Sequence, residues 1–260
     1  AVIGIPESPT RIGYQFGGWY LDDGTFNEVY AFSPSTTMPH ESLELYAQWH
    51  LRNYSLTYHN LEGTIHTNPS TFNIETATIN LAAPTNRIGY HFVGWFDALS
   101  GGNEISSIDK GTINNQTLYA RWAPIEYTVT YENLSGTTHT NPTAFTIETP
   151  TITLLNPTAK EGHIFLGWFT ALSGGSQVAK IDEGSTGNKT LYARFEANTY
   201  TITYDLAGGS GPVSLDVTYG ENFTLGLATK TGYSFMGWTY LGNPFVSGVW
   251  TLTNHITILA

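Results

Sequence analysis

The sequence predicts a mainly β protein of the small α+β class, organised as a tandem array of small repeat domains. Three observations support this prediction: sequence motifs recur every 73 residues, short segments alternate apolar and polar residues, and the composition is rich in aromatic residues and glycine. Aromatic residues make up 14% of the 260 residues, and there are 27 glycines. Aromatic side chains fit a pleated sheet and glycine suits tight turns, so this composition is typical of strands joined by turns.

Three motifs carry the repeat and recur in the same order along the chain. The opening motif reads YSLTY, YTVTY and YTITY at residues 54–58, 127–131 and 200–204. The closing motif reads LYAQW, LYARW and LYARF at residues 45–49, 118–122 and 191–195. Between them lies GYxFxGW, with His in place of Tyr once, at residues 13–19, 89–95, 162–168 and 232–238. Self-similarity at a nearly fixed period indicates a repeat architecture.

The motifs divide the chain into a truncated repeat 1, complete repeats 2 and 3, and a shortened repeat 4. The predicted boundaries are 1–50, 51–123, 124–196 and 197–260. The closing aromatic and the next opening tyrosine are always five positions apart, and the linkers HLRN, APIE and EANT are not Gly/Ser-rich, so they are not expected to act as flexible tethers. Connections this short should limit the relative motion of neighbouring repeats. Repeat 1 lacks the opening strand. We therefore expect it to expose an unpaired sheet edge and to be poorly ordered or complemented by another chain.

Alternation within the motifs predicts the strands of one repeat. In YTVTYE, the side chains of Tyr127, Val129 and Tyr131 share one face, which is the period-2 signature of a half-buried strand. The GYxFxGW strand is apolar on both faces. Two alternatives follow: a central strand covered on both sides, or a bulge at Gly94 that turns Trp95 inward. The segments SIDKG and KIDEG are expected to form one short helical turn each.

A glycine precedes a tryptophan in every copy of this strand. This pattern predicts that a neighbouring ring lies against the bare backbone, and that the tryptophan supplies the core area that a small domain without disulfides needs. The alternative is that the tryptophans stack on sugar rings at the surface. The signature residues are Gly18, Trp19, Gly94, Trp95, Gly167, Trp168, Gly237 and Trp238. Three tyrosines point away from the Leu/Ala face of the closing strand and are the better candidates for a ligand-facing role: Tyr46, Tyr119 and Tyr192.

Composition argues against several function classes. The formal net charge is −11 and no basic run exists, which disfavours nucleic acid and anionic membrane surfaces as partners. The absence of cysteine excludes disulfides and thiolate metal sites. No apolar stretch reaches the roughly 18–20 residues of a membrane span, so we expect no membrane insertion in this segment. The N-terminus does not read as a signal peptide, and we expect the chain to be a fragment of a larger exported protein.

No motif predicts catalysis, a cofactor or a metal site. His66 and His139 occupy equivalent positions, but zinc needs three or four convergent ligands, and we expect loop histidines satisfied by the backbone. The acidic turns at 21–28 and 204–211 lack the ligand spacing of an EF-hand, so we expect turn chemistry rather than calcium binding. Asp109 and Asp182 are equivalent, and a turn or capping role is expected rather than paired acid catalysis.

The ordered combination of these motifs over essentially the whole chain resembles the Listeria–Bacteroides repeat, also called the internalin B-repeat. The resemblance implies a β-grasp-like (ubiquitin-like) fold for each repeat, and a place in long secreted or wall-anchored bacterial proteins. It brings no catalytic residues. His163 departs from the pattern, because the other three copies carry tyrosine, and repeat 4 lacks the closing aromatic.

These features together predict a non-enzymatic extracellular stalk or spacer at the bacterial cell surface. The tandem repeats and short linkers predict an elongated, monomeric rod or a weakly self-associating one. The alternative is an adhesion module that binds glycans or host surface proteins through repeated faces. A hydrolase is the third hypothesis, and only generic acidic residues favour it.

Overall fold

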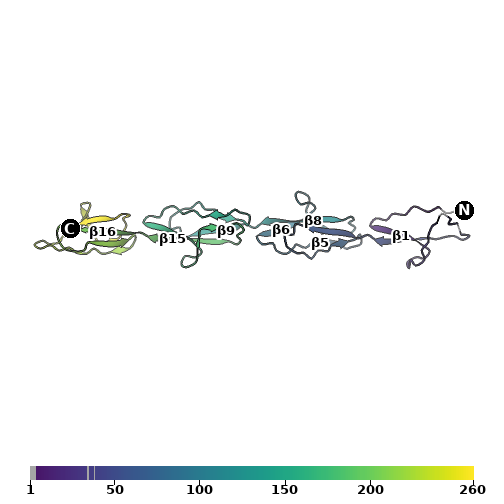
Figure 1. Cartoon of the computed structure of the whole chain (residues 1–260), viewed down its shortest axis with the longest axis horizontal. Coiled ribbons are helices and arrows are strands. Elements are labelled where there is room, and N and C mark those ends of the chain that lie inside the picture. The colour runs from purple at the N-terminus through teal and green to yellow at the C-terminus, as the bar shows by residue number, and fades with distance from the viewer. Residues whose placement is uncertain (1–3, 34, 38) are drawn as a thin grey trace. The chain divides into compact units, whose positions relative to one another are not determined.

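A computed structural model describes residues 4–33, 35–37 and 39–260. All regular secondary structure in these residues is β, which confirms the mainly β prediction. The described residues contain no helix, and so none that could cross a bilayer. The chain forms two compact units, residues 1–124 and 125–260, and each unit holds two repeats (Figure 1).

The first unit contains repeats 1 and 2. Repeat 1 forms a two-stranded antiparallel sheet from β1 (Tyr14–Tyr20) and β2 (Tyr46–Leu51). The strands of repeat 2 are β3 (Tyr54–His59), β4 (Thr71–Phe72), β5 (Ile79–Asn80), β6 (Tyr90–Phe96), β7 (Ser107–Ile108) and β8 (Gln116–Pro124). The main sheet of repeat 2 has the order β4-β3-β8-β6, and β5 and β7 form a separate ladder.

The second unit contains repeats 3 and 4. The strands of repeat 3 are β9 (Tyr127–Glu132), β10 (Ala144–Phe145), β11 (Ile152–Thr153), β12 (His163–Phe169), β13 (Gln177–Val178), β14 (Lys180–Ile181) and β15 (Lys189–Ala197). The strands of repeat 4 are β16 (Thr199–Asp205), β17 (Ser214–Thr218), β18 (Asn222–Phe223), β19 (Trp238–Tyr240), β20 (Asn243–Phe245), β21 (Gly248–Val249) and β22 (Ile256–Leu259). Their main sheets have the orders β10-β9-β15-β12-β13 and β17-β16-β22-β19-β20.

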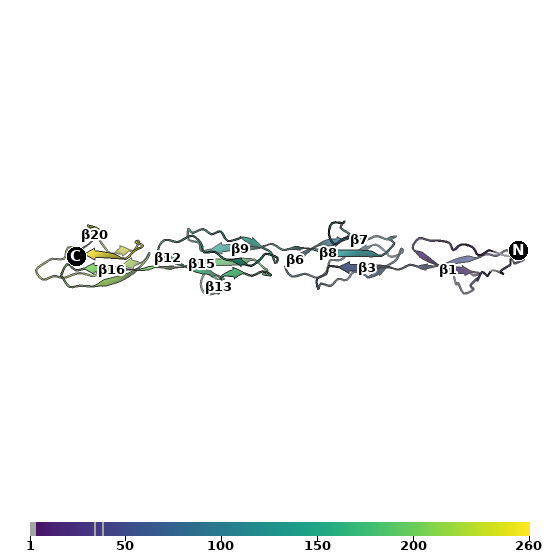
Figure 2. The same ribbon diagram turned by 45° about the horizontal axis from the view of Figure 1, so that its top comes forward.

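One arrangement is shared by repeats 2, 3 and 4. The first and last strands of the repeat lie side by side in the middle of the sheet and run parallel, while every other pairing is antiparallel. In repeat 3, β9 and β15 are adjacent in both views of the chain (Figures 1 and 2). Parallel strands need a long crossover connection, and here the rest of the repeat provides it.

A β-bulge explains the two apolar faces of the GYxFxGW strand. In repeat 2, Phe92 pairs with Trp122, but the next paired residue is Gly94, so the register of β6 shifts by one. The same shift occurs in β1 and β12. The bulge places Phe92 and Trp95 on the core side and leaves Val93 47% exposed. Of the two alternatives, the structure therefore shows the bulge that turns the tryptophan inward.

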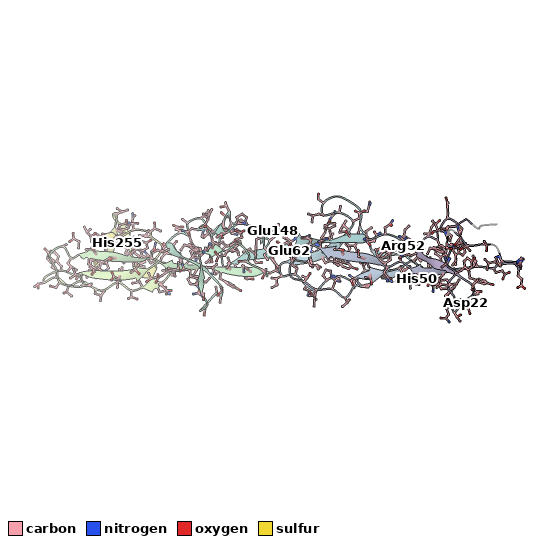
Figure 3. All side chains as sticks on the ribbon, turned by 45° about the vertical axis from the view of Figure 1, so that its right-hand side comes forward. Asp22, His50, Arg52, Glu62, Glu148 and His255 are labelled. Atoms are coloured by element: carbon pink, nitrogen blue, oxygen red, sulfur yellow. The ribbon has the colours of Figure 1, made fainter. Side chains whose placement is uncertain are left out.

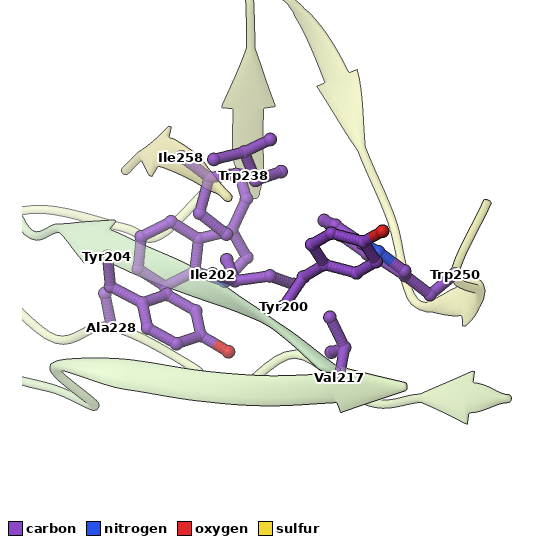
Figure 4. Packing of buried hydrophobic residues seen from close by; sticks show 9 residues of the cluster. Tyr200, Ile202, Tyr204, Val217, Ala228, Trp238, Trp250 and Ile258 are labelled. Carbon is purple, nitrogen blue, oxygen red and sulfur yellow. The ribbon is translucent and has the colours of Figure 1, made fainter. Parts of the chain in front are cut away.

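Each complete core is built around that tryptophan. Trp95 and Trp168 are each 2% exposed and Trp238 is 4% exposed. In repeat 4, Trp238 packs with Ile202 and Ile258, which come from the two parallel strands, and with Tyr204 (Figure 4). Residues at the same positions in repeats 2 and 3 form equivalent clusters. The tryptophan thus fills the space between the central strands and the loops that cover them.

The expected helical turns at SIDKG and KIDEG are absent, and that prediction is wrong. Residues 107–108 form β7, and a tight turn follows in which the amide of Thr112 donates to the carbonyl of Asp109 at 3.1 Å. The equivalent turn in repeat 3 joins Ser185 to Asp182. The pairing of β7 with β5 and of β14 with β11 holds these segments extended, which excludes a helical turn.

The glycine before the tryptophan is required for a reason other than the predicted one. A Cβ at Gly94 or Gly167 would meet the side chain of Glu104 or Gln177. The expected ring against bare backbone is therefore wrong in repeats 2 and 3, and also at Gly237, where a Cβ would meet no atom within 4 Å. It is confirmed only in repeat 1, where a Cβ at Gly18 would lie 3.4 Å from the ring of Tyr20. The φ angles are +131° at Gly18, +131° at Gly167 and +128° at Gly237. These values lie outside the regions that an L-residue adopts readily, so the backbone conformation itself requires glycine at these positions, two of which, Gly18 and Gly167, lie at the bulge.

This constraint can be tested in repeat 4, where the side of Gly237 is open. A Cβ at Gly237 or at Gly248 would meet no atom within 4 Å, but only Gly237 has a positive φ. Gly237→Ala should therefore destabilise repeat 4 by about 1–3 kcal/mol through backbone strain. The matched control Gly248→Ala should change its stability by less than about 0.5 kcal/mol. A urea titration followed by amide NMR signals of repeat 4 measures both, and equal effects would contradict the explanation.

Candidate functional site

Three of the four signature tryptophans lie in the core, and the protein satisfies the indole N–H of each of them. The indole Nε1 of Trp95 donates to the carbonyl of Ala82 at 2.9 Å. Trp168 donates in the same way to Leu155 at 2.9 Å, and Trp238 to Gly226 at 2.7 Å. Trp19 of repeat 1 is half-buried and packs edge-on against Phe16. The three fully buried rings cannot stack on a sugar, because no face of them reaches the surface.

Two histidines complete these cores. In repeat 2, the ring of His66 lies 4.1 Å from the ring of Tyr58 and 5.7 Å from that of Trp95, measured between centroids. His139 repeats this arrangement in repeat 3 with Tyr131 at 4.1 Å. The Nδ1 atoms of both histidines are buried without a hydrogen-bond partner. The expectation that the backbone satisfies these histidines is therefore wrong for Nδ1, and ring packing holds them instead.

Burial also raises the pKa of the tyrosine that packs against each histidine. Tyr58 and Tyr131 donate their hydroxyls to the carbonyls of Pro69 and Pro142, at 3.0 Å in both repeats. Desolvation raises the pKa of each phenol to about 12. Burial disfavours the phenolate, so both hydroxyls stay protonated at neutral pH and serve as structural donors. Among the described residues, no group of three His, Asp or Glu side chains converges as a metal site would require.

The acidic turn of repeat 1 uses its carboxylate to close a hairpin. Asp22 accepts hydrogen bonds from the hydroxyl of Thr25 and from the amides of Asn27 and Glu28. These donors hold the pKa of Asp22 at about 2. Six residues separate Asp22 from Glu28, and the same spacing joins Asp97 to the amide of Asn103 at 2.7 Å. The carboxylate oxygens at these turns thus bond the chain itself.

Thr170 takes the same place in the turn of repeat 3, where its hydroxyl accepts the amide of Ser176 at 3.0 Å. The hydroxyl of Thr170 therefore accepts a backbone amide across the turn, as the carboxylates of Asp22 and Asp97 do in the other repeats. The position requires a hydrogen-bond acceptor rather than a charge. In the second acidic segment, Asp205 accepts the amide of Ala207 at 3.0 Å. All of these contacts are hydrogen bonds that close turns within the chain, as expected from the sequence.

The three tyrosines proposed as ligand-facing lie half-buried on the face of the sheet opposite the core. Tyr119 stacks on His59 with ring centroids 5.3 Å apart. The hydroxyl of Tyr46 donates to Glu44 at 3.0 Å, and this bond raises the pKa of the phenol. At the position of His59, repeat 3 carries an exposed glutamate, Glu132, near Tyr192 in the paired strand. The tyrosines thus recur, but the groups beside them differ from one repeat to the next.

An arginine beside each of the last two tyrosines was not predicted as a key residue. The guanidinium of Arg121 lies 3.7 Å above the ring of Phe96 and donates from Nη2 to the carbonyls of Ala98 and Gly101. Arg194 does the same in repeat 3 with Phe169, Ala171 and Gly174. Only these two repeats carry the turn sequence ALSGG, and repeat 1 has Gln48 at this position.

The ALSGG turn is therefore bound to the sheet by a side chain from the closing strand. Its two glycines adopt left-handed φ angles of +66° and +70° in repeat 2, which lets the turn fold back toward the arginine. The turn carries an exposed leucine, Leu99 in repeat 2 and Leu172 in repeat 3. The joint occurrence of ALSGG and LYAR in two repeats is the sequence signal that could have revealed this contact.

The arrangement of polar groups offers little for catalysis. Asp109 accepts from the hydroxyl of Ser107 at 2.9 Å, and Asp182 pairs with Lys180 at 2.7 Å on the exposed surface. Both acids sit at turns. The outer face of the closing strand carries a tyrosine and an arginine in repeats 2 and 3, Tyr119 with Arg121 and Tyr192 with Arg194. Such a face, with its partly exposed aromatic and charged side chains, can contact a partner.

A substitution at Arg194 tests whether the arginine holds the turn. Arg194→Gln, which installs the residue of repeat 1, should speed the hydrogen exchange of the Thr170 and Ser176 amides about tenfold, because the turn loses its anchor. The equivalent amides of Asp97 and Asn103 in repeat 2 serve as the reference within the same molecule and should not change. Exchange measured by NMR at neutral pH gives both rates. Unchanged exchange at residues 170 and 176 would show that the hairpin holds without the arginine.

Comparison with known proteins places this architecture. A Putative membrane protein of Evansella cellulosilytica is 30% identical over 252 residues, which are 92% of this chain and 36% of that protein. A Putative Gly-rich membrane protein of the same organism is 30% identical over 91% of this chain and 27% of its own length. Internalin H of Listeria monocytogenes is 36% identical over 45% of this chain and 20% of its own length. The chain therefore spans about a third or less of each relative.

No solved structure matches the chain. The family model of the Listeria–Bacteroides repeat domain matches four times in tandem, at residues 1–48, 54–121, 127–194 and 200–259. These matches cover most of the chain, and each contains one copy of the tryptophan of the GYxFxGW motif. The chain belongs to the Listeria–Bacteroides repeat family.

Proposed function

We propose that the chain is a non-enzymatic stalk or spacer region of a bacterial cell-surface or secreted protein. The observation that carries this proposal is that the residues shared by the repeats serve internal packing and the joints between repeats. The recurrent tryptophans, histidines and arginines all bond or pack within their own repeat. A chain of such repeats can act as a spacer of defined length, because the residues that the repeats share stabilise the fold of each repeat and form no common catalytic site.

The joints between repeats 1 and 2 and between repeats 3 and 4 support the proposal because they are short and hydrogen-bonded. Asn198 is the only residue between β15 and β16. Its amide donates to the carbonyl of Gly162 at 2.8 Å, and its own carbonyl accepts the amide of Tyr219 at 3.0 Å. The linker between repeats 3 and 4 is thus bonded to both of them. A bonded linker of this length limits bending far more than a Gly/Ser tether does.

The joint of repeats 1 and 2 has the same construction. The amide of Arg52, labelled in Figure 3, donates to the carbonyl of Gly13 at 3.0 Å, and its Nε donates to the carbonyl of Tyr14. A Cβ at Gly13 would lie 2.7 Å from Ile74, just as one at Gly162 would lie 2.2 Å from the ring of Tyr219. The glycine turn of one repeat therefore sits directly against the next repeat in both units.

The relatives supply the proposed location. Two are named as membrane proteins and one as an internalin, and all are much longer than this chain. We place the chain outside the cell, between other parts of a larger exported protein. A β-grasp-like fold for each repeat is part of the same proposal. It is supported by the central parallel pairing of the first and last strands, although the described residues have no helix across the sheet.

The length per repeat tests the spacer function. Deleting residues 124–196 removes one period and joins repeat 2 to repeat 4. Under the proposal, the chain is a monomer or self-associates only weakly, and its repeats are arranged end to end. The maximum dimension from small-angle scattering should then fall by about 30–40 Å. That is roughly the length of the nine-residue strand β15 plus its linker. The radius of gyration should fall in step. A compact particle, or a dimension that the deletion leaves unchanged, would contradict the spacer function.

The alternative function is adhesion to glycans or host surface proteins. The observation that favours it is the aromatic and arginine face of repeats 2 and 3, which presents half-buried Tyr119 and Tyr192 beside an arginine. A glycan array and a panel of host matrix proteins test it, with the Tyr119→Ser, Tyr192→Ser double variant as the control. Binding that the double variant loses would favour adhesion, whereas blank screens would leave the spacer role.

A further inference from the structure

In repeats 2, 3 and 4, the central parallel pair bonds the strand by which the chain enters the repeat to the strand by which it leaves. Residues 56–59 pair with 116–119 in repeat 2, residues 129–132 with 189–192 in repeat 3, and residues 202–205 with 256–259 in repeat 4. In every case the first strand of the repeat is bonded to its last strand. The segments between them contribute the remaining strands and loops.

Asparagine side chains extend this ladder at both ends. In repeat 3, the Oδ1 of Asn188 accepts the amide of Thr128 at 3.0 Å, just before the ladder begins. Beyond its other end, the Nδ2 of Asn133 donates to the carbonyl of Ala193 at 2.7 Å. Asn133 has a φ of +59°, so the backbone turns away from the strand while its side chain continues the bonding.

Repeat 2 has the same two bonds. Asn115 accepts the amide of Ser55 at 3.0 Å, and Asn60 donates to the carbonyl of Ala120 at 2.7 Å. In repeat 4, His255 accepts the amide of Thr201 at 2.9 Å, while Leu206 stands where the other repeats have the donor asparagine. The complete pair of asparagine bonds is therefore a property of repeats 2 and 3.

The side chains on the core side of the ladder are fully buried from solvent. In repeat 3, Val129, Leu191 and Ala193 are 3%, 2% and 0% exposed, and the corresponding residues of repeat 2 are buried to the same degree. Water therefore cannot readily replace a ladder bond as it opens from this side. The bond between Asn133 and Ala193 is itself partly buried.

The direction of the strands decides how the ladder responds to a pull along the chain. The two strands are parallel, so the start of β9 and the end of β15 lie at opposite ends of the pair. Tension on the two ends of a repeat slides one strand along the other. The ladder bonds are then loaded together, whereas a pull on two neighbouring strand ends would open them one at a time.

We propose that the asparagine-ended parallel pair is a mechanical clamp that enables repeats 2 and 3 to bear tension along the chain. Its biological use rests on the proposed spacer function, since a spacer that presents another domain transmits any force on that domain. The geometry assigns the clamp to β3–β8 and β9–β15. Forced unfolding is governed by the unfolding rate, so the clamp acts through the barrier that these bonds raise.

The test is single-molecule stretching of the full chain, held by handles at its two ends. Repeats 2 and 3 should give two unfolding events of similar high force, each releasing on the order of 24 nm of chain at about 3.4 Å per residue. Asn133→Asp replaces the donor with an acceptor that faces the carbonyl of Ala193. It should raise the unfolding rate of one of the two events about tenfold at fixed force, because a partly buried hydrogen bond is lost. Repeat 2 remains as the reference in the same molecule.

Two matched variants separate a clamp from general destabilisation. Asn188→Asp keeps the acceptor that Thr128 requires and should leave both events unchanged. Asn141→Ala removes a buried asparagine that bonds the amide and carbonyl of Leu155, outside the parallel pair. It should lower stability in urea at least as much as Asn133→Asp. It should nevertheless alter the unfolding rate under force less than about twofold. In the unmutated chain the bonds of Asn141 are still intact when the ladder yields, so their removal destabilises the native state and the transition state equally.

The outcomes are distinct. One weakened event in Asn133→Asp, with both events intact in Asn188→Asp and Asn141→Ala, supports the clamp. Equal weakening by Asn133→Asp and Asn141→Ala, or no effect of Asn133→Asp, overturns it. Either overturning result leaves the solution length per repeat unaffected, so the spacer function would stand without the clamp. A compact solution shape would remove the spacer function and leave the forces as measured.

Discussion

The pairing of the first strand with the last is the constraint on which each complete repeat depends. In repeat 3, the bond between Asn133 and Ala193 connects residues 60 positions apart, and the neighbouring ladder closes the same long loop. Closing such a loop costs chain entropy, which a domain of this size recovers only by burying apolar area. The tryptophan supplies that area at the centre of the repeat. Trp168 touches the ring of Tyr131 from the first strand and lies in one cluster with Leu191 from the last.

The other features of the repeat follow from placing that tryptophan. The ring can reach the core only because a bulge shifts the strand by one residue, and the bulge brings glycine into a φ of +131° at Gly167. The indole N–H then needs a buried acceptor, which the carbonyl of Leu155 provides. The loop that carries this carbonyl is fixed in turn by Asn141, which bonds both polar groups of Leu155. One large side chain thus explains a bulge, a glycine and a buried asparagine.

Much of the local structure could be predicted from the sequence, because it depends on patterns within short segments. The alternation in YTVTYE predicts β9, and four copies of GYxFxGW made a core tryptophan the favoured interpretation. The pairing of strands could not be predicted, since period-2 alternation shows which face is buried but not which strand lies beside it. Two-residue strands such as β7 and β14 were too short to give a pattern, and were wrongly expected to be helical turns.

The candidate site was predictable only in outline. The half-buried positions of Tyr119 and Tyr192 follow from alternation along LYARW and LYARF. The role of Arg194 depends on carbonyls 20 and 23 residues away, which no local pattern reveals. The asparagines that end the ladder did leave a signal, because Asn60 and Asn133, and Asn115 and Asn188, recur at 73 residues. In a polar loop, however, turn chemistry accounts for asparagine equally well.

The central claim is that the parallel pair holds the rest of the repeat together, and native-state hydrogen exchange in the intact chain tests it most directly. The amides of residues 129–132 and 189–192 should be among the slowest in repeat 3. Their exchange should show the full urea dependence of unfolding of the repeat, together with the buried amides of β12. If the amides of the parallel pair exchange through a smaller opening while those of β12 stay protected, the antiparallel pairing of β12 with β15 holds the repeat, and the account is wrong.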